Sequence, residues 1–358
     1  MKPSIPSLLL VCAILALGDA AVDRFRMFRV FGDSEPEIEL RSFQNPQDRS
    51  RRLPLIYWLW DTETAPYLKG FGIDRIAVPP EKADEWTRAG FKVLALSEEE
   101  LGRRTKVHAP RISERADEAS ATHRPWIESS GWRFVRDPDG KFYYDLAGEP
   151  PERAALAAAE AFVYRADVIL KAEPAELEKV GPLLRFLGEL PQAAGPALAD
   201  IGLVDDGQPL TGEVMNLLIR RNLLFRIVPA PARQLPINVQ LGTREFPRRE
   251  AADPSAFAQK LRRKLTDERR TLRIFGSEVV IGRLTGERGR IRLQLLNYGE
   301  EEIDGLRVRV RGTYRPVEAV VYGRGRAPLE DVTRAAGFTE FSIPNLGIYG
   351  LVELTIAR

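Results

Sequence analysis

From residue 53 onward the sequence alternates short apolar runs with helix-like segments, and this alternation constrains the fold more than any other feature. Residues 56–60, IYWLW, are typical of a buried strand, and residues 73–97 repeat the order strand, helix, strand. Gly72 and Gly90 stand where a helical segment gives way to a strand, the usual place for a C-terminal cap. The sequence therefore predicts an α/β fold with a parallel sheet, of which a partial (β/α)8 barrel is one form.

The middle of this region contains three further predicted elements. Residues 131–146, GWRFVRDPDGKFYYDL, hold two aromatic runs around Asp139-Gly140, which favours a tight β-hairpin. The polar stretch from Lys106 to Ser130 carries both histidines and predicts a long loop. An Ala-rich helix over 151–164 then leads into a strand from Asp167 to Lys171.

Residues 200–228 form one complete strand-helix-strand unit in which two aspartates follow the first strand. We expect Thr211 to cap the helix and Asn222 to end it in the left-handed conformation. Asp205 and Asp206 are candidate site residues if the chain forms one continuous sheet. They end a strand and cap a helix if this unit is an accessory domain, which is the interpretation we favour.

Beyond about residue 276 the pattern changes to period two, as in LRVRVRG and GLVELTIAR. Alternating arginine and valine predict strands with one wet and one buried face, hence an antiparallel β-sandwich. A basic helix over 255–265, with Phe257 and Leu261 inward, precedes this region. We therefore predict an α/β region at 53–195, an α/β accessory unit at 196–276 and the sandwich at 277–358.

The first twenty residues have the pattern of a secretory signal. Lys2 precedes an apolar run from Leu8 to Leu17, and Gly18 and Ala20 are small residues placed as at a cleavage site. The run is too short for a comfortable transmembrane span. We predict cleavage near Ala20, a secreted or periplasmic location, and an N-terminal extension at 21–52.

Composition excludes several kinds of chemistry. Cys12, the only cysteine, lies in the predicted signal, so thiol chemistry and disulfides are not expected in the mature chain. His108 and His123 are too few for a three-histidine zinc site, and no phosphate-binding GxxxxGK[ST] sequence occurs. We expect neither metal nor cofactor. The net charge of +2 gives no field that favours nucleic acid. Carboxylate chemistry, of which glycoside hydrolysis is the commonest example, is what is left.

Two stretches resemble barrel glycoside hydrolases of the beta-galactosidase type. Residues 290–312, RIRLQLLNYGEEEIDGLRVRVRG, are similar to the opening of the small C-terminal β domain of those enzymes, and residues 200–228 are similar to a unit of their flavodoxin-like domain. The resemblance implies a catalytic barrel ahead of these two domains. Residues 53–190 are too few for a full barrel, which takes ~200 residues or more. The Asn-Glu pair of those enzymes occurs nowhere in this chain.

Candidate site residues therefore come from position alone. Ligands meet the carboxyl ends of parallel strands, so acids at those ends are the candidate catalytic groups. Aromatic rings beside them can form a platform for a sugar ring. The candidate acids are Asp61, Asp145 and Glu173, and the candidate platform residues are Trp58, Trp60, Trp132 and Tyr144.

Two functions are open at this point. The first is an exported protein that acts on or binds carbohydrate through these carboxylates and rings. The second is a non-catalytic extracytoplasmic binding or assembly protein on a hydrolase-like scaffold.

Overall fold

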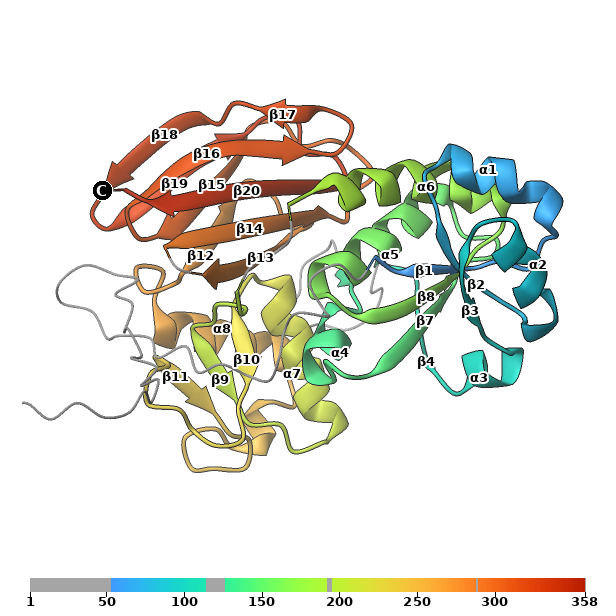
Figure 1. The fold of residues 1–358 in the computed structure, drawn as a ribbon. Helices are drawn as coiled ribbons and strands as arrows, with labels where there is room; N and C mark the ends of the chain where they lie inside the picture. The colour runs from blue at the N-terminus through green and yellow to red at the C-terminus, as the bar shows by residue number, and fades with distance from the viewer. Residues whose placement is uncertain (1–52, 114–125, 192–194, 288, 358) are drawn as a thin grey trace, which may run out of the picture.

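The computed structural model describes residues 53–113, 126–191, 195–287 and 289–357. The predicted signal, the extension at 21–52 and His123 lie outside these ranges. Within them the chain has a parallel-sheet α/β region, a smaller α/β unit and a C-terminal antiparallel β region, which confirms the predicted fold class (Figure 1). No helix among the described residues is long and apolar enough to cross a membrane.

The first region is built around a six-stranded parallel sheet. Its strands are β1 (Leu55–Tyr57), β2 (Arg75–Val78), β3 (Lys92–Ala95), β4 (Thr105–Val107), β7 (Lys141–Asp145) and β8 (Asp167–Lys171). Its helices are α1 (Ala65–Gly70), α2 (Ala83–Arg88), α3 (Glu98–Gly102), α4 (Gly131–Arg136), α5 (Pro151–Tyr164) and α6 (Pro174–Glu189). The short 3-10 helices η2 (Thr62–Thr64) and η3 (Pro80–Lys82) follow β1 and β2.

The strand order, β3-β2-β1-β8-β7-β4, is that of a barrel opened at one seam. From one edge to the other the strands are β4, β7, β8, β1, β2 and β3. Strands that follow one another in this region of the chain are therefore neighbours in the sheet, if the residues between β4 and β7 are set aside. The exception is β3 to β4, which occupy opposite edges. A closed barrel would pair these two strands. The first region is therefore a six-stranded partial barrel, as the sequence allowed.

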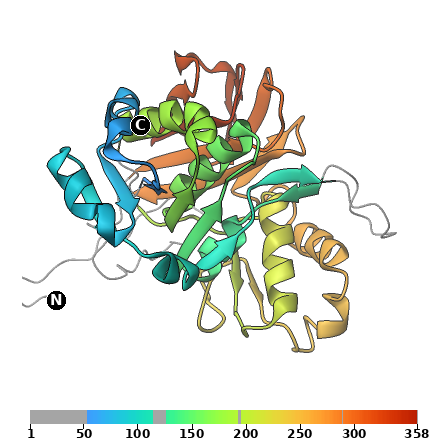
Figure 2. The same ribbon diagram turned by 90° about the vertical axis from the view of Figure 1, so that its right-hand side faces the viewer.

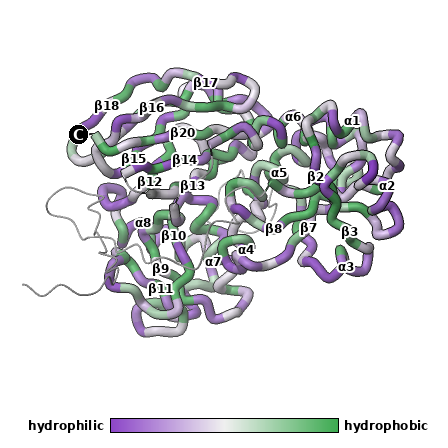
Figure 3. Tube along the Cα trace, viewed as in Figure 1, coloured by the Kyte–Doolittle hydropathy of each residue, from purple (hydrophilic) through white to green (hydrophobic). Residues whose placement is uncertain are grey.

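The two faces of this sheet differ. Alternate side chains such as Ile56, Val78 and Leu170 join the main core beneath α1, α2, α5 and α6. The opposite face, which a closed barrel would enclose, carries a small cluster of Tyr57, Ala77 and Ile169 covered by two leucines near α3. Figure 3 shows α3 itself as hydrophilic. The sheet is thus fully covered on one side only.

Two predicted elements of this region are wrong in detail. Residues 131–136 form α4 rather than the first strand of a hairpin, and only the second aromatic run is a strand, β7. Tertiary packing decides this, because Phe134 stacks edge-on against Phe142 and Trp132 lies against α7. The predicted loop at 106–130 contains the end of β4 and the hairpin β5 (Arg111–Ser113) and β6 (Trp126–Glu128). Figure 2 shows this hairpin extending beside α7.

The second unit has a three-stranded parallel sheet in the order β10-β9-β11. Its elements are β9 (Ile201–Leu203), α7 (Pro209–Arg220), β10 (Phe225–Ile227), β11 (Ile237–Val239), η4 (Arg248–Glu250) and α8 (Pro254–Leu265). This is the strand order 2-1-3 with which flavodoxin-like sheets begin. Asn222 has the expected positive φ of 52°. Thr211 is not the cap, because Pro209 begins the helix and Gln208 precedes it as N-cap.

The third region is a sandwich of a four-stranded and a five-stranded antiparallel sheet around its own core. Its strands are β12 (Leu272–Phe275), β13 (Val280–Glu287), β14 (Arg290–Asn297), β15 (Leu306–Arg311), β16 (Tyr314–Val321), β17 (Gly325–Ala327), β18 (Glu330–Ala335), β19 (Phe338–Ile343) and β20 (Tyr349–Ile356). β14 is buried on both faces, because Leu293 and Leu295 enter the sandwich core while Leu296 joins the main core. The sandwich therefore packs directly onto the α/β part.

Candidate functional site

Asp61 lies at the carboxyl end of the central strand β1, in an ion pair. Its Oδ1 accepts a hydrogen bond from Nζ of Lys82 at 2.7 Å, and Lys82 ends the 3-10 helix that follows β2. Lys82 also donates to the backbone carbonyl of Leu59. The carboxylate is exposed, so the pair is screened by water and contributes little stability. Asp61 is accessible to a ligand, with a cation beside it.

Asp145, the last residue of β7, is held by a different lysine. Its Oδ2 accepts from Nζ of Lys106 on β4 at 2.8 Å, and this hydrogen bond raises the pKa of Lys106 above its ordinary value. Because side chains alternate along a strand, Asp145 faces away from the core side where Tyr144 is buried. Asp145 is therefore a half-buried, ion-paired carboxylate on the open face of the sheet.

Glu173 begins α6 as its N-cap residue. Its backbone N–H donates to Oε2 of Glu176 at 2.8 Å, one half of a capping box, and its own side chain is exposed. This placement gives Glu173 a role in starting the helix after β8.

Asp61 and Asp145 each pair with a lysine on the side of the sheet that lies away from the other aspartate. Asp61 binds the lysine that follows β2, whereas Asp145 binds a lysine on β4, and in the sheet order β2 and β4 are four strand spacings apart. The aspartates themselves follow β1 and end β7, which are two strand spacings apart, ~10 Å at about 4.8 Å per spacing. The two carboxyl groups of a glycosidase stand about 5 to 5.5 Å or 6.5 to 9.5 Å apart. The sheet edge thus carries separate carboxylate–lysine pairs that lean toward opposite edges.

Of the four aromatic residues predicted to form a sugar platform, one is exposed. Trp58 is fully buried, and its Nε1 donates to Oγ1 of Thr64 at 2.9 Å. Trp60 is 47% exposed and its ring lies 6.5 Å from that of Trp58, centroid to centroid. Trp132 is half-buried against α7, and Tyr144 is fully buried. Of the four, Trp60 alone is exposed, and it directly precedes Asp61 in the sequence.

A carboxylate that sequence reasoning missed lies at the centre of the molecule. Glu160 of α5 is fully buried, and it accepts hydrogen bonds from the hydroxyls of Tyr144 and Tyr298, each at 2.6 Å. It also accepts from the Ser129 hydroxyl and from the Ser130 backbone N–H. Burial, followed by the charge of Glu160, raises the pKa of both tyrosines well above the usual value. The available signal was one acid within an alanine-rich buried face.

The geometry of this buried network indicates a structural role for Glu160. It joins β7, α5 and the segment before α4 to Tyr298, which follows β14 in the C-terminal region. Every oxygen of Glu160 has a partner, so the carboxylate is satisfied inside the protein.

Asp205 and Asp206, for which the sequence allows two roles, lie between β9 and α7. Asp205 accepts two hydrogen bonds of 2.8 Å from the guanidinium of Arg136, in α4 of the first region. Asp206 accepts from the Gln208 backbone N–H at 3.0 Å and from the Thr211 hydroxyl at 2.6 Å. The sheet of this unit is separate from the six-stranded sheet. Neither aspartate is the N-cap of α7, which is Gln208. Asp205 connects the unit to the first region.

Metal-ligand geometry is not found in the part of the chain that the structure describes. No group of three or more His, Cys, Asp or Glu side chains within it is arranged to hold an ion. His108 is exposed just beyond β4.

Comparison with known proteins gives structural similarities only. No family model and no curated protein sequence matches the chain. An alpha-L-fucosidase from Paenibacillus thiaminolyticus is similar with a TM-score of 0.46 and 10% identity, over 63% of this chain and 62% of that one. A beta-galactosidase from Rahnella sp. R3 gives 0.40 and 8%, over 79% and 63%.

A rhamnosidase from Novosphingobium sp. PP1Y gives a TM-score of 0.44 and 10% identity, over 77% of this chain and 38% of that one. The chain thus spans less than two thirds of each of these three structures. The three are glycoside hydrolases, and one of them is a beta-galactosidase, the type of enzyme that the sequence resembles. TM-scores below 0.5 at such identities assign no activity to this chain.

Proposed function

We propose that this chain is an exported, glycoside-hydrolase-like protein that binds carbohydrate without cleaving it. The observation that supports this most is the exposed side chain of Trp60, the residue directly before Asp61 of the Asp61–Lys82 pair, at the carboxyl end of the central strand β1. The apolar C–H face of a sugar packs on such a ring, while a carboxylate and an ammonium group bind hydroxyls. The partial barrel holds all three groups on short connections after β1 and β2.

The arrangement of the acids favours binding over hydrolysis. Cleavage of a glycosidic bond takes two carboxyl groups at a defined separation on either side of the bond. Here Asp61 and Asp145 pair with lysines toward opposite edges of the sheet, and Glu173 starts a helix. Asp61 therefore serves as a hydrogen-bond acceptor for a ligand hydroxyl, with Lys82 as the matching donor.

The test is a titration of the full chain against a panel of soluble oligosaccharides, followed by calorimetry on those that bind. Trp60→Ala should weaken binding by about tenfold, since an aromatic contact is worth ~1.5 kcal/mol. Leu59→Ala is the matched control, because Leu59 is the neighbouring residue and is 40% exposed. Equal affinity in the Trp60 variant and the wild type would refute the platform.

The catalytic alternative is tested on the same ligands. We expect no release of reducing sugar from any ligand that binds. Release that disappears in Asp61→Asn or Asp145→Asn would instead establish an enzyme. Export rests on the N-terminal pattern, and the intact mass of extracytoplasmic protein tests it. A mass that retains residues 1–20 would contradict export with cleavage.

A further inference from the structure

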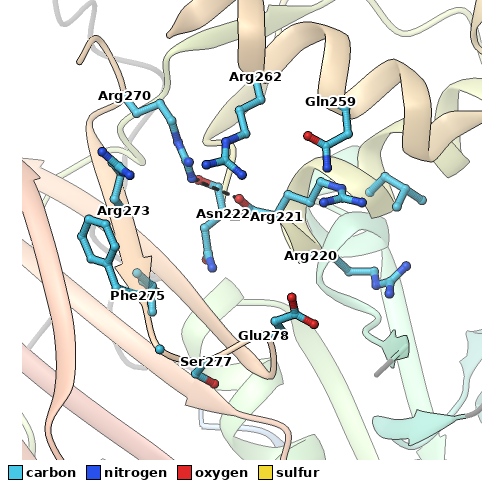
Figure 4. Close-up of a pocket in the computed structure, with 13 residues that line it drawn as sticks. Arg220, Arg221, Asn222, Gln259, Arg262, Arg270, Arg273, Phe275, Ser277 and Glu278 are labelled. Carbon is cyan, nitrogen blue, oxygen red and sulfur yellow. Dashed lines mark hydrogen bonds between the residues drawn. The ribbon is translucent and has the colours of Figure 1, made fainter. Parts of the chain in front are cut away.

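A cavity of about 590 Å³ lies away from the sheet edge, where the second unit meets the β-sandwich (Figure 4). It is bounded by the C-terminal end of α7, one side of α8, the strand β12 and the turn between β12 and β13. Arginines dominate its lining, which comprises Leu217, Arg220, Arg221, Asn222, Gln259, Arg262, Arg270, Arg273, Ile274, Phe275, Gly276, Ser277 and Glu278.

The lining carries a large excess of positive charge. Five of its side chains are arginines, and Glu278 is its one acid. Asp267, just outside, binds Arg262, Arg270 and Arg273 at 3.0 to 3.2 Å. Hydrogen bonds from Arg262, foremost, and from Arg270, together with the charge of Arg273, lower the pKa of Asp267 to about 2. One carboxylate thus serves three guanidinium groups, and the cavity keeps a net positive charge.

Part of this cluster has an ordinary structural role. Arg270 donates to the backbone carbonyls of Arg221 and Asn222 at 3.1 and 3.2 Å, and so satisfies the C-terminal end of α7. Arg220 lies over the Trp126 ring, 3.3 Å from its centroid. These contacts account for the presence of two arginines, whereas the lining as a whole still has five arginines and one acid.

The buried arginines also have unmet hydrogen-bonding capacity. Arg221 donates to the Ser255 hydroxyl at 2.9 Å, but its Nε is buried and has no hydrogen-bond partner among the described residues. The same holds for Nε of Arg270. Burial, and next the charge of Arg262, lowers the pKa of Arg221, with Glu278 and Asp253 acting in the opposite direction. Crowded, partly desolvated guanidinium groups are costly unless an anion compensates them.

We propose that this cavity, the arginine pocket, binds a small hydroxylated anion through its carboxylate or phosphate group. The guanidinium fork matches both groups in geometry, and the volume suits a small molecule rather than a polymer. Ser277 on the β12–β13 turn and Gln259 on α8 are neutral polar groups available to ligand hydroxyls, whereas Glu278 opposes an anion. A sugar acid and a sugar phosphate share this chemistry. The pocket is independent of the carbohydrate site at Trp60.

The test is calorimetric titration of the full chain at low and high salt. The probes are glucuronate, glucose 6-phosphate, inorganic phosphate and neutral glucose. We expect an anionic sugar to bind, with affinity that falls as salt rises, and glucose not to bind at this site. The ratio of glucuronate to glucose 6-phosphate affinity identifies which anionic group is preferred. Failure of every anion to bind at low salt would overturn the proposal.

Two variants connect binding to the pocket. Arg273→Gln should weaken anion binding about tenfold or more, because a charge-assisted hydrogen bond is lost while Arg270 keeps its structural contacts. Glu278→Gln should strengthen binding several-fold by removing the acid in the lining, a gain that misfolding cannot mimic. Glu278 is exposed, so this variant is expected to fold.

Arg326→Gln is the matched control. Arg326 is exposed on β17, where it pairs with Glu318, and its substitution changes net charge by the same amount. Equal weakening by Arg326→Gln and Arg273→Gln, or no strengthening by Glu278→Gln, would refute a site in the pocket. Trp60→Ala should leave anion binding unchanged, which separates this site from the carbohydrate site.

Discussion

Single charged residues in this protein stabilise it mainly by joining elements that are far apart in the sequence. Glu160 connects β7, α5 and the residue after β14, and Asp205 connects the second unit to α4. Asp267 acts locally instead, because it pairs with three arginines that lie within six residues of it, from the end of α8 to β12. For Asp267 the hydrogen bonds and ion pairs also lower the pKa of the carboxyl group, which makes this residue one source of acid sensitivity.

Asp267 should account for part of the loss of stability in acid. Its pKa is about 2 in the folded chain and 3.8 ordinarily, so its contribution is complete above pH 3.8 and is lost as the pH falls through 2. The shift corresponds to about 2 kcal/mol of unfolding free energy. Its side chain is 27% exposed, so solvent screening reduces this only modestly.

Denaturant titrations of the wild type and Asp267→Asn between pH 2 and 6 measure this contribution. We expect the variant to be less stable at pH 6 by about 2 kcal/mol and the difference to vanish near pH 2. A difference that does not change with pH would show that the effect comes from packing rather than charge.

At the scale of elements, close helix contacts depend on particular glycines. Gly181 in α6 lies against the Phe71 ring, and a Cβ at this position would overlap it. Gly188, in the same helix, has only Leu53 near the place of its Cβ, at 3.5 Å. Substitution by alanine should therefore change the stability of the protein in opposite directions at these two positions.

Gly181→Ala should destabilise the protein by about 1–3 kcal/mol through overpacking. Gly188→Ala should instead stabilise it by up to ~1 kcal/mol, since alanine favours the helix. Thermal and urea unfolding of both variants measure the difference. Stabilisation by Gly181→Ala would mean that α1 moves away from α6 with little cost.

The elements that could be predicted are those whose pattern is set by local sequence. The strand Asp167–Lys171 and the helix ending at Leu265 were predicted to within a residue, and the period-two strands of the C-terminal region were identified. The first half of the predicted hairpin failed because Trp132 and Phe134 pack against neighbours that are distant in sequence. Local aromatic content cannot distinguish such a helix from a strand.

The candidate site was less predictable than the fold. Strand ends placed Asp61, Asp145 and Glu173 near the carboxyl edge, but the lysines that pair with the aspartates come from other strands. Burial of Trp58 and exposure of Trp60 depend on how the chain leaves β1. The arginine pocket gathers residues 217–278 from three elements, none of which carries a recognisable pattern alone.

At the scale of the whole molecule, the two α/β parts share one core. The main buried cluster includes Ile56 and Leu170 of the first sheet, Ile201 and Leu218 of the second unit, and Leu351 of β20. The sandwich has an additional core of its own. The division at residues 195 and 196 stays a prediction, and the common core implies that both α/β parts unfold together.

Leu218→Ala tests this cooperativity. Leu218 is fully buried in α7, and its truncation should cost about 2–5 kcal/mol. We expect amide hydrogen exchange to accelerate equally in β9 and in the distant strands β1 and β8. Acceleration confined to residues 196–276 would show that the second unit opens independently.

The seam between β3 and β4 also affects how molecules of this protein meet one another. A closed barrel has no edge strand, whereas here β3 and β4 each have one side with no neighbouring strand among the described residues. Unpaired backbone groups at such an edge can template a strand from another molecule. Strand β3 has four residues and carries Lys92, and strand β4 has three residues and carries Lys106. Short length and charge on β3 and β4 should therefore limit strand pairing between molecules at the two edges of the open sheet.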